Sequence, residues 1–285
     1  MSMSNGQWKM ENVKCERSEP VIHGVCNGEN ERSEPGRLES GGVDNGRLNK
    51  FIKTKDGSFT LKSEKYNECY HSSEGAYTES LYKHVLPGYT VAEKFDYYGG
   101  EIRILDICFG LGYNTLTALL HKPKNVKLKI FSPELDLKLI KSLKHFKYPE
   151  KFENLLSVIN DISRNLYYKS DNVEIEIFNG DAREYVKKLS DIHIVYQDAF
   201  SPKVNKELWT MEYFKNISEI LHKNSIITTY SVATPVRCAF YKLGMNIYTH
   251  PYDEIRKGTI ASYAKLDFPK VDFEEKLKRV KCITY

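Results

Sequence analysis

Short apolar runs alternate with amphipathic stretches along residues 103–243. Strands are expected at the apolar runs, which are 103–108, 127–131, 173–178, 192–197 and 225–230. Helices are expected at the stretches with helical spacing, which are 114–121, 135–146, 182–189, 206–222 and 235–243, with one more before residue 171. Strands that are apolar throughout are typical of a sheet covered on both faces. The pattern predicts an α/β fold, with a mostly parallel sheet and helices on both faces.

The chain before and after this alternation has a different pattern. Residues 51–53 and 58–62 alternate around Asp56-Gly57, which predicts a β-hairpin. A helix is expected over 77–85, ended by Pro87-Gly88. Two antiparallel strands, 245–249 and 259–265, are expected to complete the sheet. We therefore expect an N-terminal hairpin and helix over residues 51–100, packed on a core domain of residues 101–285.

Residues 1–50 lack any hydrophobic period. Glu-Arg-Ser-Glu-Pro occurs at 16–20 and again at 31–35, and Gly, Asn, Ser and Glu dominate the segment. Such a composition buries too little apolar surface to offset the entropy of ordering the chain. We expect a disordered, low-complexity extension, with a tail that contacts a partner as the alternative.

Composition limits the classes of protein that the chain can represent. Of its 285 residues, 41% are hydrophobic, which is ample for a core. No run of about 18 apolar residues is present and the first residues lack the apolar stretch of a secretory signal, so we expect a cytoplasmic protein without a membrane span. The net charge of +4 is compatible with a polyanionic partner, and equally with a solvated lysine-rich surface. The six cysteines form no Cys-x-x-Cys pair and have no histidine at metal-ligand spacing, so neither disulfides nor a metal site are expected.

Residues 109–114, Phe-Gly-Leu-Gly-Tyr-Asn, follow the first strand of the alternation. Gly110 and Gly112 permit a sharp turn and a close approach of a ligand to the main chain. The start of the next helix offers free N–H groups. The loop therefore predicts either a nucleotide-type cofactor site or a tight strand-to-helix turn without a ligand.

Acidic residues follow the second and third strands. Glu134 suits the two hydroxyls of a ribose, because a carboxylate accepts two hydrogen bonds side by side. Asp181 suits an adenine amine, with the N–H of Ala182 on a ring nitrogen. The alternative for both acids is a place at a helix N-terminus. Three such features after three successive strands favour a cofactor that carries a nucleoside.

Asp198 follows the fourth strand within residues 195–210, Val-Tyr-Gln-Asp-Ala-Phe-Ser-Pro-Lys-Val-Asn-Lys-Glu-Leu-Trp-Thr. A carboxylate at the carboxyl end of a buried strand is in a position suited to chemistry at the edge of the sheet. The alternative is a cap for the turn at Phe200-Ser201-Pro202. Trp209, in the same segment, is expected to pack in the core.

The segment 195–210 resembles the Asp-Gly-Phe-Ala-Pro-x-x-Asn-Pro-x-x-Trp-Thr signature of the methyltransferase domain of MnmC, a family of bacterial tRNA wobble-uridine modification enzymes. The loop 109–114 resembles the family's Gly-Phe-Gly-Thr-Gly-x-Asn loop, and 131–134 and 70–82 resemble two further segments. The match runs from about residue 54 to about residue 265. Leu111 and Tyr113 depart from the usual Thr and Leu, and Asp106 stands where Glu is common.

The resemblance implies a Rossmann-like class I methyltransferase that uses S-adenosylmethionine and no metal, without the FAD-dependent oxidase domain of two-domain members. The implied reaction converts the 5-aminomethyl group of wobble uridine, with or without a 2-thio group, to a methylaminomethyl group. The implied partners are a tRNA anticodon stem-loop and separate enzymes that supply the aminomethyl precursor. Asp198 is then the catalytic base. The cofactor residues are Asp106, Gly110, Gly112, Asn114, Glu134, Asp181 and Ala182.

Further residues are candidates for the substrate side. Tyr70, Phe200 and Tyr230 are expected to wall a flipped base or shield the sulfonium, with core packing as the alternative. Glu79 lies in one of the resembling segments. The candidates for binding anticodon phosphates are Lys203, Arg237, Arg256 and Lys257, with solvated surface cations as the alternative. Two other functions stay open: a methyltransferase or aminopropyltransferase-like enzyme for a small-molecule amine, and a non-catalytic cofactor-binding partner of a tRNA-modifying protein.

Overall fold

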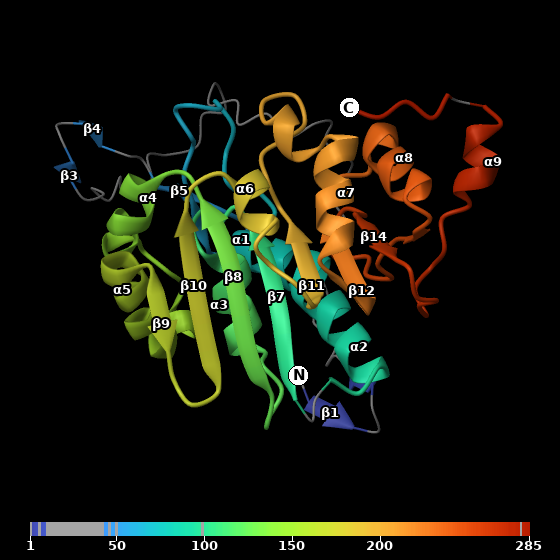
Figure 1. Cartoon of the computed structure of the whole chain (residues 1–285). Helices are drawn as coiled ribbons and strands as arrows, with labels where there is room; N and C mark the ends of the chain where they lie inside the picture. Colours follow the sequence, from blue (N-terminus) through green and yellow to red (C-terminus); the bar gives the residue numbers. More distant parts are fainter. Residues whose placement is uncertain are drawn as a thin grey trace.

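The computed structural model (Figure 1) describes residues 51–97, 100–279 and 281–285 and, within residues 1–50, the backbone of two short strand pairs. These pairs join β1 (Ser2–Ser4) to β2 (Gln7–Lys9) and β3 (Val43–Asp44) to β4 (Arg47–Leu48). The remainder of residues 1–50 lies outside the described residues, so the disorder expected there stays a prediction.

An eight-stranded sheet forms the centre of the molecule, in the order β13-β14-β12-β11-β7-β8-β10-β9. Its parallel strands are β12 (Leu221–Thr229), β11 (Ile192–Gln197), β7 (Glu101–Ile107), β8 (Lys127–Glu134) and β10 (Val173–Asn179). The antiparallel strands are β9 (Tyr167–Lys169), β14 (Thr259–Ser262) and β13 (Asn246–Tyr248). Later strands add to both sides of β7, and ligands of such sheets bind beyond the carboxyl ends at this reversal of order. Those ends share the upper edge in Figure 1.

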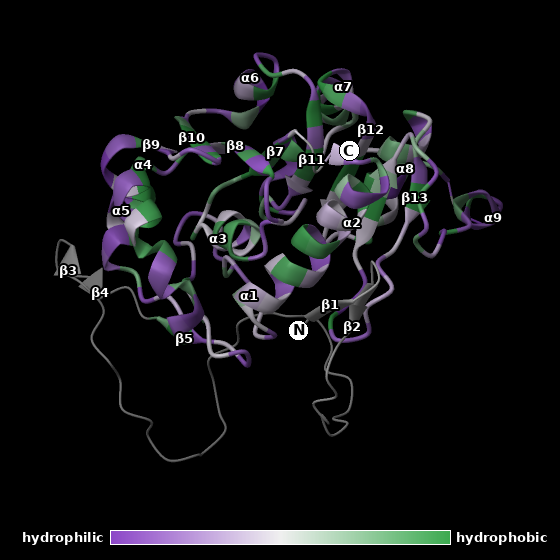
Figure 2. Ribbon diagram, turned by 90° about the horizontal axis from the view of Figure 1, so that it is seen from below, coloured by the Kyte–Doolittle hydropathy of each residue, from purple (hydrophilic) through white to green (hydrophobic). Residues whose placement is uncertain are grey.

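Helices cover both faces of the sheet, and two hydrophobic clusters fill the space between (Figure 2). One cluster contains Ile104 and Ile194, and the other contains Leu105 and Val195, so successive residues of paired strands point to opposite faces. The first face carries α1 (Ala76–Glu79), the π-helical turn η1 (Ser80–Val85), α2 (Leu86–Lys94), α3 (Tyr113–Leu120), α4 (Leu137–Ser142) and α5 (Leu156–Asn165). The second carries α6 (Ala182–Val186), α7 (Met211–Glu219), α8 (Thr234–Lys242) and α9 (Phe273–Leu277). The predicted two-sided α/β architecture is confirmed.

The helix expected over 77–85 does not stop at Pro87-Gly88. It continues through η1 into α2, where Pro87 occupies the first turn. Proline lacks an N–H, and the wider π turn before it changes the i→i−4 pairing that the proline would break. Gly88 serves packing, because a Cβ atom there would lie 3.0 Å from Cγ2 of Ile194 in β11. The expected helix end was therefore wrong.

The N-terminal hairpin is confirmed and two other elements differ from expectation. β5 (Ile52–Lys53) pairs with β6 (Phe59–Thr60) around Gly57, whose φ is +81°. The helix expected over 206–222 is divided into the 3₁₀ turn η5 (Lys206–Leu208) and α7, which Thr210 caps by accepting from the N–H of Tyr213. Residues 221–224, Leu-His-Lys-Asn, belong to β12 instead, and the antiparallel edge strand β9 was not foreseen. The 3₁₀ turns η3 (Leu143–His145) and η4 (Glu150–Leu155) lie between α4 and α5.

The absence of disulfides was also expected, and the structure contradicts it. Cys238 in α8 pairs with Cys282 in the C-terminal segment, with the Cα atoms 5.4 Å apart. Cys69 is also disulfide-bonded. Cysteines far apart in sequence become neighbours only in the fold, so their spacing held no signal. Among the described residues, no helix has the length and apolar character needed to cross a bilayer.

Candidate active site

Strand β11 delivers Asp198 to the carboxyl edge of the sheet. Every residue of this strand is buried, and Asp198 follows its last residue with 21% of its side chain exposed. Asn114 of α3 donates from Nδ2 to Oδ2 at 2.9 Å. His84 of η1 places Nε2 at 3.5 Å from Oδ1. Three segments far apart in sequence thus meet at one carboxylate.

The surroundings of Asp198 keep its carboxylate charged. Burial acts to raise the pKa of Asp198, but the His84 imidazole, when it is protonated, and the hydrogen bond from Asn114 hold the pKa below its usual value. The turn that Asp198 was alternatively expected to cap is held otherwise, since the N–H of Ser201 donates to Oε2 of Glu68 at 3.1 Å. An anionic group at the mouth of the sheet can bind a cation and accept a proton.

Asp106 supports this arrangement from beneath. It is fully buried in β7 and accepts from Nδ2 of Asn114 at 3.2 Å and from Oγ1 of Thr115 at 2.8 Å. The Asn114 amide therefore donates to two carboxylates, Asp106 and Asp198. Its Oδ1 atom is buried and has no partner within the described part of the chain. Asp106 positions Asn114, and the free Oδ1 can accept a hydrogen bond from a ligand.

Asp106→Asn is expected to change how stability depends on pH. Burial raises the pKa of Asp106 to about 7, above its usual value of 3.8. The folded protein thus holds this proton more tightly than the unfolded chain does, and the stability gained at low pH is lost as the pH rises through 7. Asparagine carries no such proton. We expect the free energy of unfolding of the variant, relative to wild type, to rise by about 3 kcal/mol from pH 5 to pH 8 in urea titrations. A constant difference would contradict the assignment.

The glycine loop after β7 is tied to the end of β8. Gly110 and Gly112 have φ values of +55° and +76°, a region that favours glycine. The N–H of Gly110 donates to Oε2 of Glu134 at 3.0 Å, and the N–H of Asp136 donates to Oε1 at 2.8 Å. Burial raises the pKa of Glu134, while these hydrogen bonds oppose the shift. The carboxylate is fixed beside the loop, with lone pairs left for a ligand.

Asp181 lies between β10 and α6, a position compatible with both predicted roles, which are adenine binding and helix capping. It follows β10 and caps α6, accepting from the N–H of Arg183 at 2.8 Å. The Arg183 guanidinium also binds its carboxylate. Ala182 is the first residue of α6 and is buried. The capping alternative describes the contacts of Asp181, and adenine binding by it and Ala182 stays a prediction.

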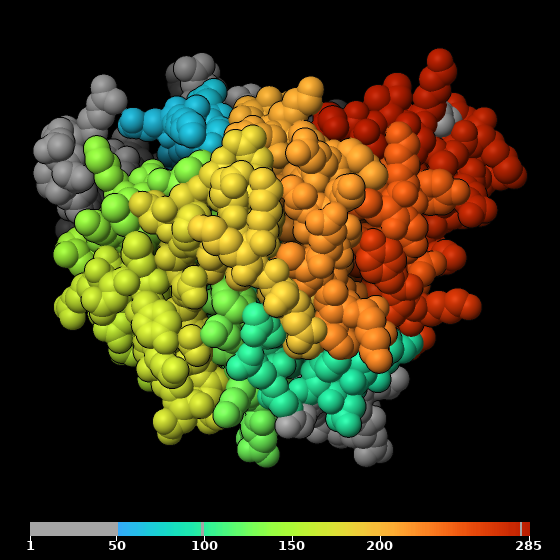
Figure 3. Space-filling view, viewed as in Figure 1, coloured from blue at the N-terminus to red at the C-terminus, as the bar shows by residue number. Residues whose placement is uncertain are grey.

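An aromatic cover lies over the carboxyl edge. The ring of Phe200 lies 4.7 Å from that of Tyr66 and 5.0 Å from that of Tyr70. Glu68 fastens the two segments, because it accepts from Oγ of Ser201 at 2.6 Å. Figure 3 shows the light-blue segment after residue 50 on the upper surface, between green α4 and the amber loop after β11. Tyr70 also lies over the glycine loop, since a Cβ atom on Gly110 would be 3.3 Å from its ring.

Tyr230 and Glu79 both lie beside Lys83. Tyr230 donates its hydroxyl to the carbonyl of Ala199 at 3.0 Å, and its ring faces Nζ of Lys83 at 6.0 Å. Glu79 pairs with Lys83 one helical turn away and accepts from the N–H of Ser72 at 2.9 Å. Burial acts against the charge of Glu79, yet Lys83 holds the pKa of Glu79 below its usual value.

The cations expected at the substrate side have unlike surroundings. Lys203 is exposed in the loop after β11. Arg237 donates from Nε to Oγ1 of Thr259 at 2.9 Å and so fastens α8 to β14. Lys257 donates to the carbonyl of Tyr252 at 2.9 Å within its own exposed loop, beside Arg256. To bind a phosphate, Arg237 or Lys257 would have to give up these hydrogen bonds to Thr259 or Tyr252.

His84, Lys83 and Glu68 were not predicted from the sequence to belong to this site. These residues precede the first strand of the sheet, where no strand end or glycine loop marks them. The only available signal for His84 was a single histidine within a helical stretch that precedes the alternating strands and helices.

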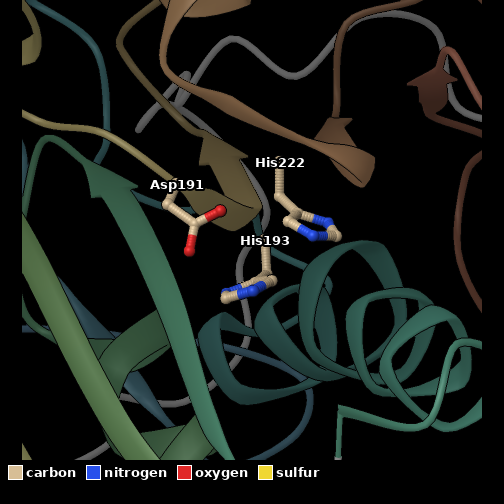
Figure 4. Close-up of side chains that lie close together, drawn as sticks. All are labelled: Asp191, His193 and His222. Carbon is tan, nitrogen blue, oxygen red and sulfur yellow. The ribbon is translucent and has the colours of Figure 1, made fainter.

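A second cluster, of Asp191, His193 and His222, lies at the amino end of β11 (Figure 4). One carboxylate oxygen and one nitrogen of each ring lie within 4.8 Å of one another. Nδ1 of His193 accepts from the N–H of Arg103 at 3.0 Å, and Nδ1 of His222 accepts from the N–H of Asn224 at 3.3 Å. A neutral imidazole that accepts a hydrogen bond at Nδ1 carries its proton at Nε2. Each of the two histidine rings therefore lacks a nitrogen with a lone pair free for a metal ion. This hydrogen bonding opposes a metal site here, and a metal-free reaction stays a prediction.

Comparisons with known proteins point to one family. A family described as S-adenosyl-L-methionine-dependent methyltransferase matches residues 146–264, which include β10, β11, Asp198 and β12. The crystal structure of MnmC2 from Aquifex aeolicus superposes with a TM-score of 0.69 at 33% identity, covering 80% of this chain and 74% of that one.

Two curated relatives are longer than the matched region. MJ0670, an uncharacterized protein of Methanocaldococcus jannaschii, is 29% identical over 81% of this chain and 64% of its own length. The tRNA 5-methylaminomethyl-2-thiouridine biosynthesis bifunctional protein MnmC of Dichelobacter nodosus is 23% identical over 64% of this chain and 32% of its own length. The chain thus spans under two thirds of the first relative and about a third of the second.

Proposed function

Because the chain belongs to the MnmC2 family of S-adenosyl-L-methionine-dependent methyltransferases, we propose that it methylates the 5-aminomethyl group of the wobble uridine in tRNA. The product is the 5-methylaminomethyl group, on uridine or 2-thiouridine. The bifunctional MnmC relatives support this proposal by name. The partner is then a tRNA anticodon stem-loop, separate enzymes supply the aminomethyl precursor, and the place of action is the cytoplasm.

The residues at the carboxyl edge fit S-adenosyl-L-methionine. Gly110 and Gly112 allow the positive-φ turn of the loop, and Glu134 is fixed beside it with acceptor capacity for a ribose. The buried, partnerless Oδ1 of Asn114 suits a donor on the amino-acid end of the cofactor. Bound there, the cofactor supplies an electrophilic methyl group on a sulfonium. Asp181 and Ala182 would hold the adenine, and Asp106 acts through Asn114.

The observation that carries the proposal is the charged carboxylate of Asp198 at the end of β11. A primary amine resembles lysine, with a pKa of roughly 10, so at neutral pH it carries a proton that blocks its lone pair. A carboxylate can hold the ammonium and take that proton. The low pKa of Asp198 keeps this group anionic across the neutral range. A hydroxyl substrate would gain much less from such a site.

The aromatic side chains around Asp198 suit a nucleobase. Phe200, Tyr70 and Tyr230 lie at the same edge of the sheet, and base–aromatic stacking contributes about 1–3 kcal/mol for each base. Glu79, which keeps its charge beside Lys83, adds a second acidic group that can face the cationic aminomethyl arm. Lys203 is the exposed cation nearest in sequence to Asp198 among the candidates for phosphate contact.

Tritium transfer tests the proposal directly. The purified chain is incubated with methyl-labelled S-adenosyl-L-methionine and bulk tRNA from a strain that lacks this methylation, and the digested nucleosides are separated. We expect label in a nucleoside that comigrates with a 5-methylaminomethyl-uridine standard. tRNA from a strain that cannot make the aminomethyl precursor is the control and should stay unlabelled.

Two other outcomes would contradict the proposal. Label in a small-molecule amine, and none in tRNA, would favour an enzyme of polyamine-type substrates. Cofactor binding without transfer to either substrate would favour a non-catalytic partner of a tRNA-modifying protein.

A further inference from the structure

His84 is a buried histidine in contact with the proposed catalytic base. Its side chain is 1% exposed, and its Nε2 atom lies 3.5 Å from Oδ1 of Asp198. On the other side of the ring, Nδ1 lies 2.7 Å from Oγ1 of Thr228 in β12. The imidazole therefore bridges the carboxylate and a strand of the central sheet.

The contacts of Thr228 determine which nitrogen of His84 carries the proton. The Thr228 hydroxyl donates to the carbonyl of Val195 at 3.2 Å, which uses its single hydrogen. Oγ1 can then only accept from Nδ1 of His84, so Nδ1 carries the proton of the neutral ring. Nε2 faces Asp198 with a lone pair, and the gap between Nε2 and Oδ1 has room for one proton.

We propose that His84 is the second proton site of this carboxylate, taking up at Nε2 the proton that Asp198 removes from the substrate ammonium. The proposal rests on the function proposed above. His84 acts through Asp198 and is a positioning residue for the base. The step moves one proton only. An N–H bond of the substrate breaks as an O–H bond forms on Asp198, and that O–H bond breaks as Nε2–H forms on His84.

The magnitudes favour a second site. An amine like that of lysine binds a proton about six powers of ten more tightly than an ordinary aspartate does. It binds the proton about four powers of ten more tightly than an ordinary imidazole does. Asp198 is a weaker base still, because the hydrogen bond from Asn114 stabilises its carboxylate. Passing the proton to an imidazole thus recovers part of an otherwise very unfavourable equilibrium.

Other titratable groups surround the pair. They are Tyr196 in β11, Asp106 in β7, His71 before α1, and Lys83 with Glu79 on the helix of His84 itself. Burial raises the pKa of Tyr196 and lowers that of His71, so both stay neutral near pH 7. Lys83 and Glu79 neutralise each other. Asp106 titrates near pH 7, so the test must observe the His84 ring itself.

Nitrogen-15 NMR of histidine-labelled protein provides that observation without any tRNA. His84→Gln identifies the signals of His84 by their loss. At pH 8 we expect the Nδ1–H tautomer, with Nε2 unprotonated, and proton uptake at Nε2 as the pH falls. Asp198→Asn should make this uptake require a lower pH, and Thr228→Val should remove the tautomer preference. An Nε2–H tautomer, or an imidazolium that persists to pH 9, would overturn the proposal.

Kinetics supply a second test. The glutamine in His84→Gln can donate to Asp198 but cannot take up a proton. We expect kcat at pH 7 to fall about 10- to 100-fold, within the range of proton-transfer effects, and to recover as the pH rises, with KM for tRNA unchanged. His145→Gln, an exposed histidine in η3, is the matched control. A wild-type pH profile in His84→Gln would overturn the proposal. A wild-type chain inactive on every tRNA would instead refute the proposed function, and the NMR result would still decide the role of His84.

Discussion

Asp198→Asn is expected to lower the rate of methyl transfer by about 10²–10⁴-fold, the usual contribution of a positioned base. Asparagine keeps the volume of the side chain and an oxygen that can accept from Asn114, so the fold should survive. It cannot take a proton from an ammonium or hold its charge. Initial rates of label incorporation into tRNA, at saturating cofactor, measure the effect.

Asp191→Asn is the matched control, because Asp191 lies just before the opposite end of the same strand and is exposed. Its φ of +56° is one that asparagine tolerates well. Both variants should bind S-adenosyl-L-methionine within a few-fold of wild type in calorimetry and melt near the wild-type temperature. Near-wild-type turnover in Asp198→Asn would remove the carboxylate from the chemistry.

The parallel core of the fold could be predicted from the sequence because short segments rich in Ile, Val, Leu and Phe recur between amphipathic stretches. Strand β8 shows the limit of this prediction, because its polar carboxyl end was not foreseen. It was expected over 127–131, but it continues through Ser132 and Pro133 to Glu134. Its carboxyl end pairs with β10, so backbone hydrogen bonding extends the strand past its apolar part. Strand ends that carry function are polar, and periodicity underestimates them.

The residues of the candidate site likewise fall into those that could be predicted from the sequence and those that could not. Gly110, Glu134 and Asp198 could be placed together because each lies at or just after the carboxyl end of a parallel strand, and parallel strands end at one edge. His84 and Glu68 come from segments before the first of these strands, and only tertiary packing brings them to that edge. The helix that carries His84 was expected, yet which of its residues would face Asp198 depends on the π turn η1, which shifts the helical register.

Glu134→Ala is expected to weaken S-adenosyl-L-methionine binding about 10- to 150-fold. Hydrogen bonds to a charged group contribute about 1.5–3 kcal/mol, and the proposed ribose contact would be lost together with the acceptor for Gly110 and Asp136. Isothermal titration calorimetry with the cofactor alone measures this without a tRNA substrate.

Glu134→Gln separates the two roles of the side chain. Glutamine retains the volume and one oxygen for the N–H of Gly110, but it cannot accept two hydrogen bonds side by side from a ribose. We therefore expect glutamine to restore the melting temperature more fully than the affinity. Glu153→Ala, an exposed glutamate in η4, should leave both unchanged. If Glu134→Ala bound the cofactor as wild type does, the carboxylate would serve the glycine loop alone, and the nucleoside would have to be held by other groups at this edge of the sheet.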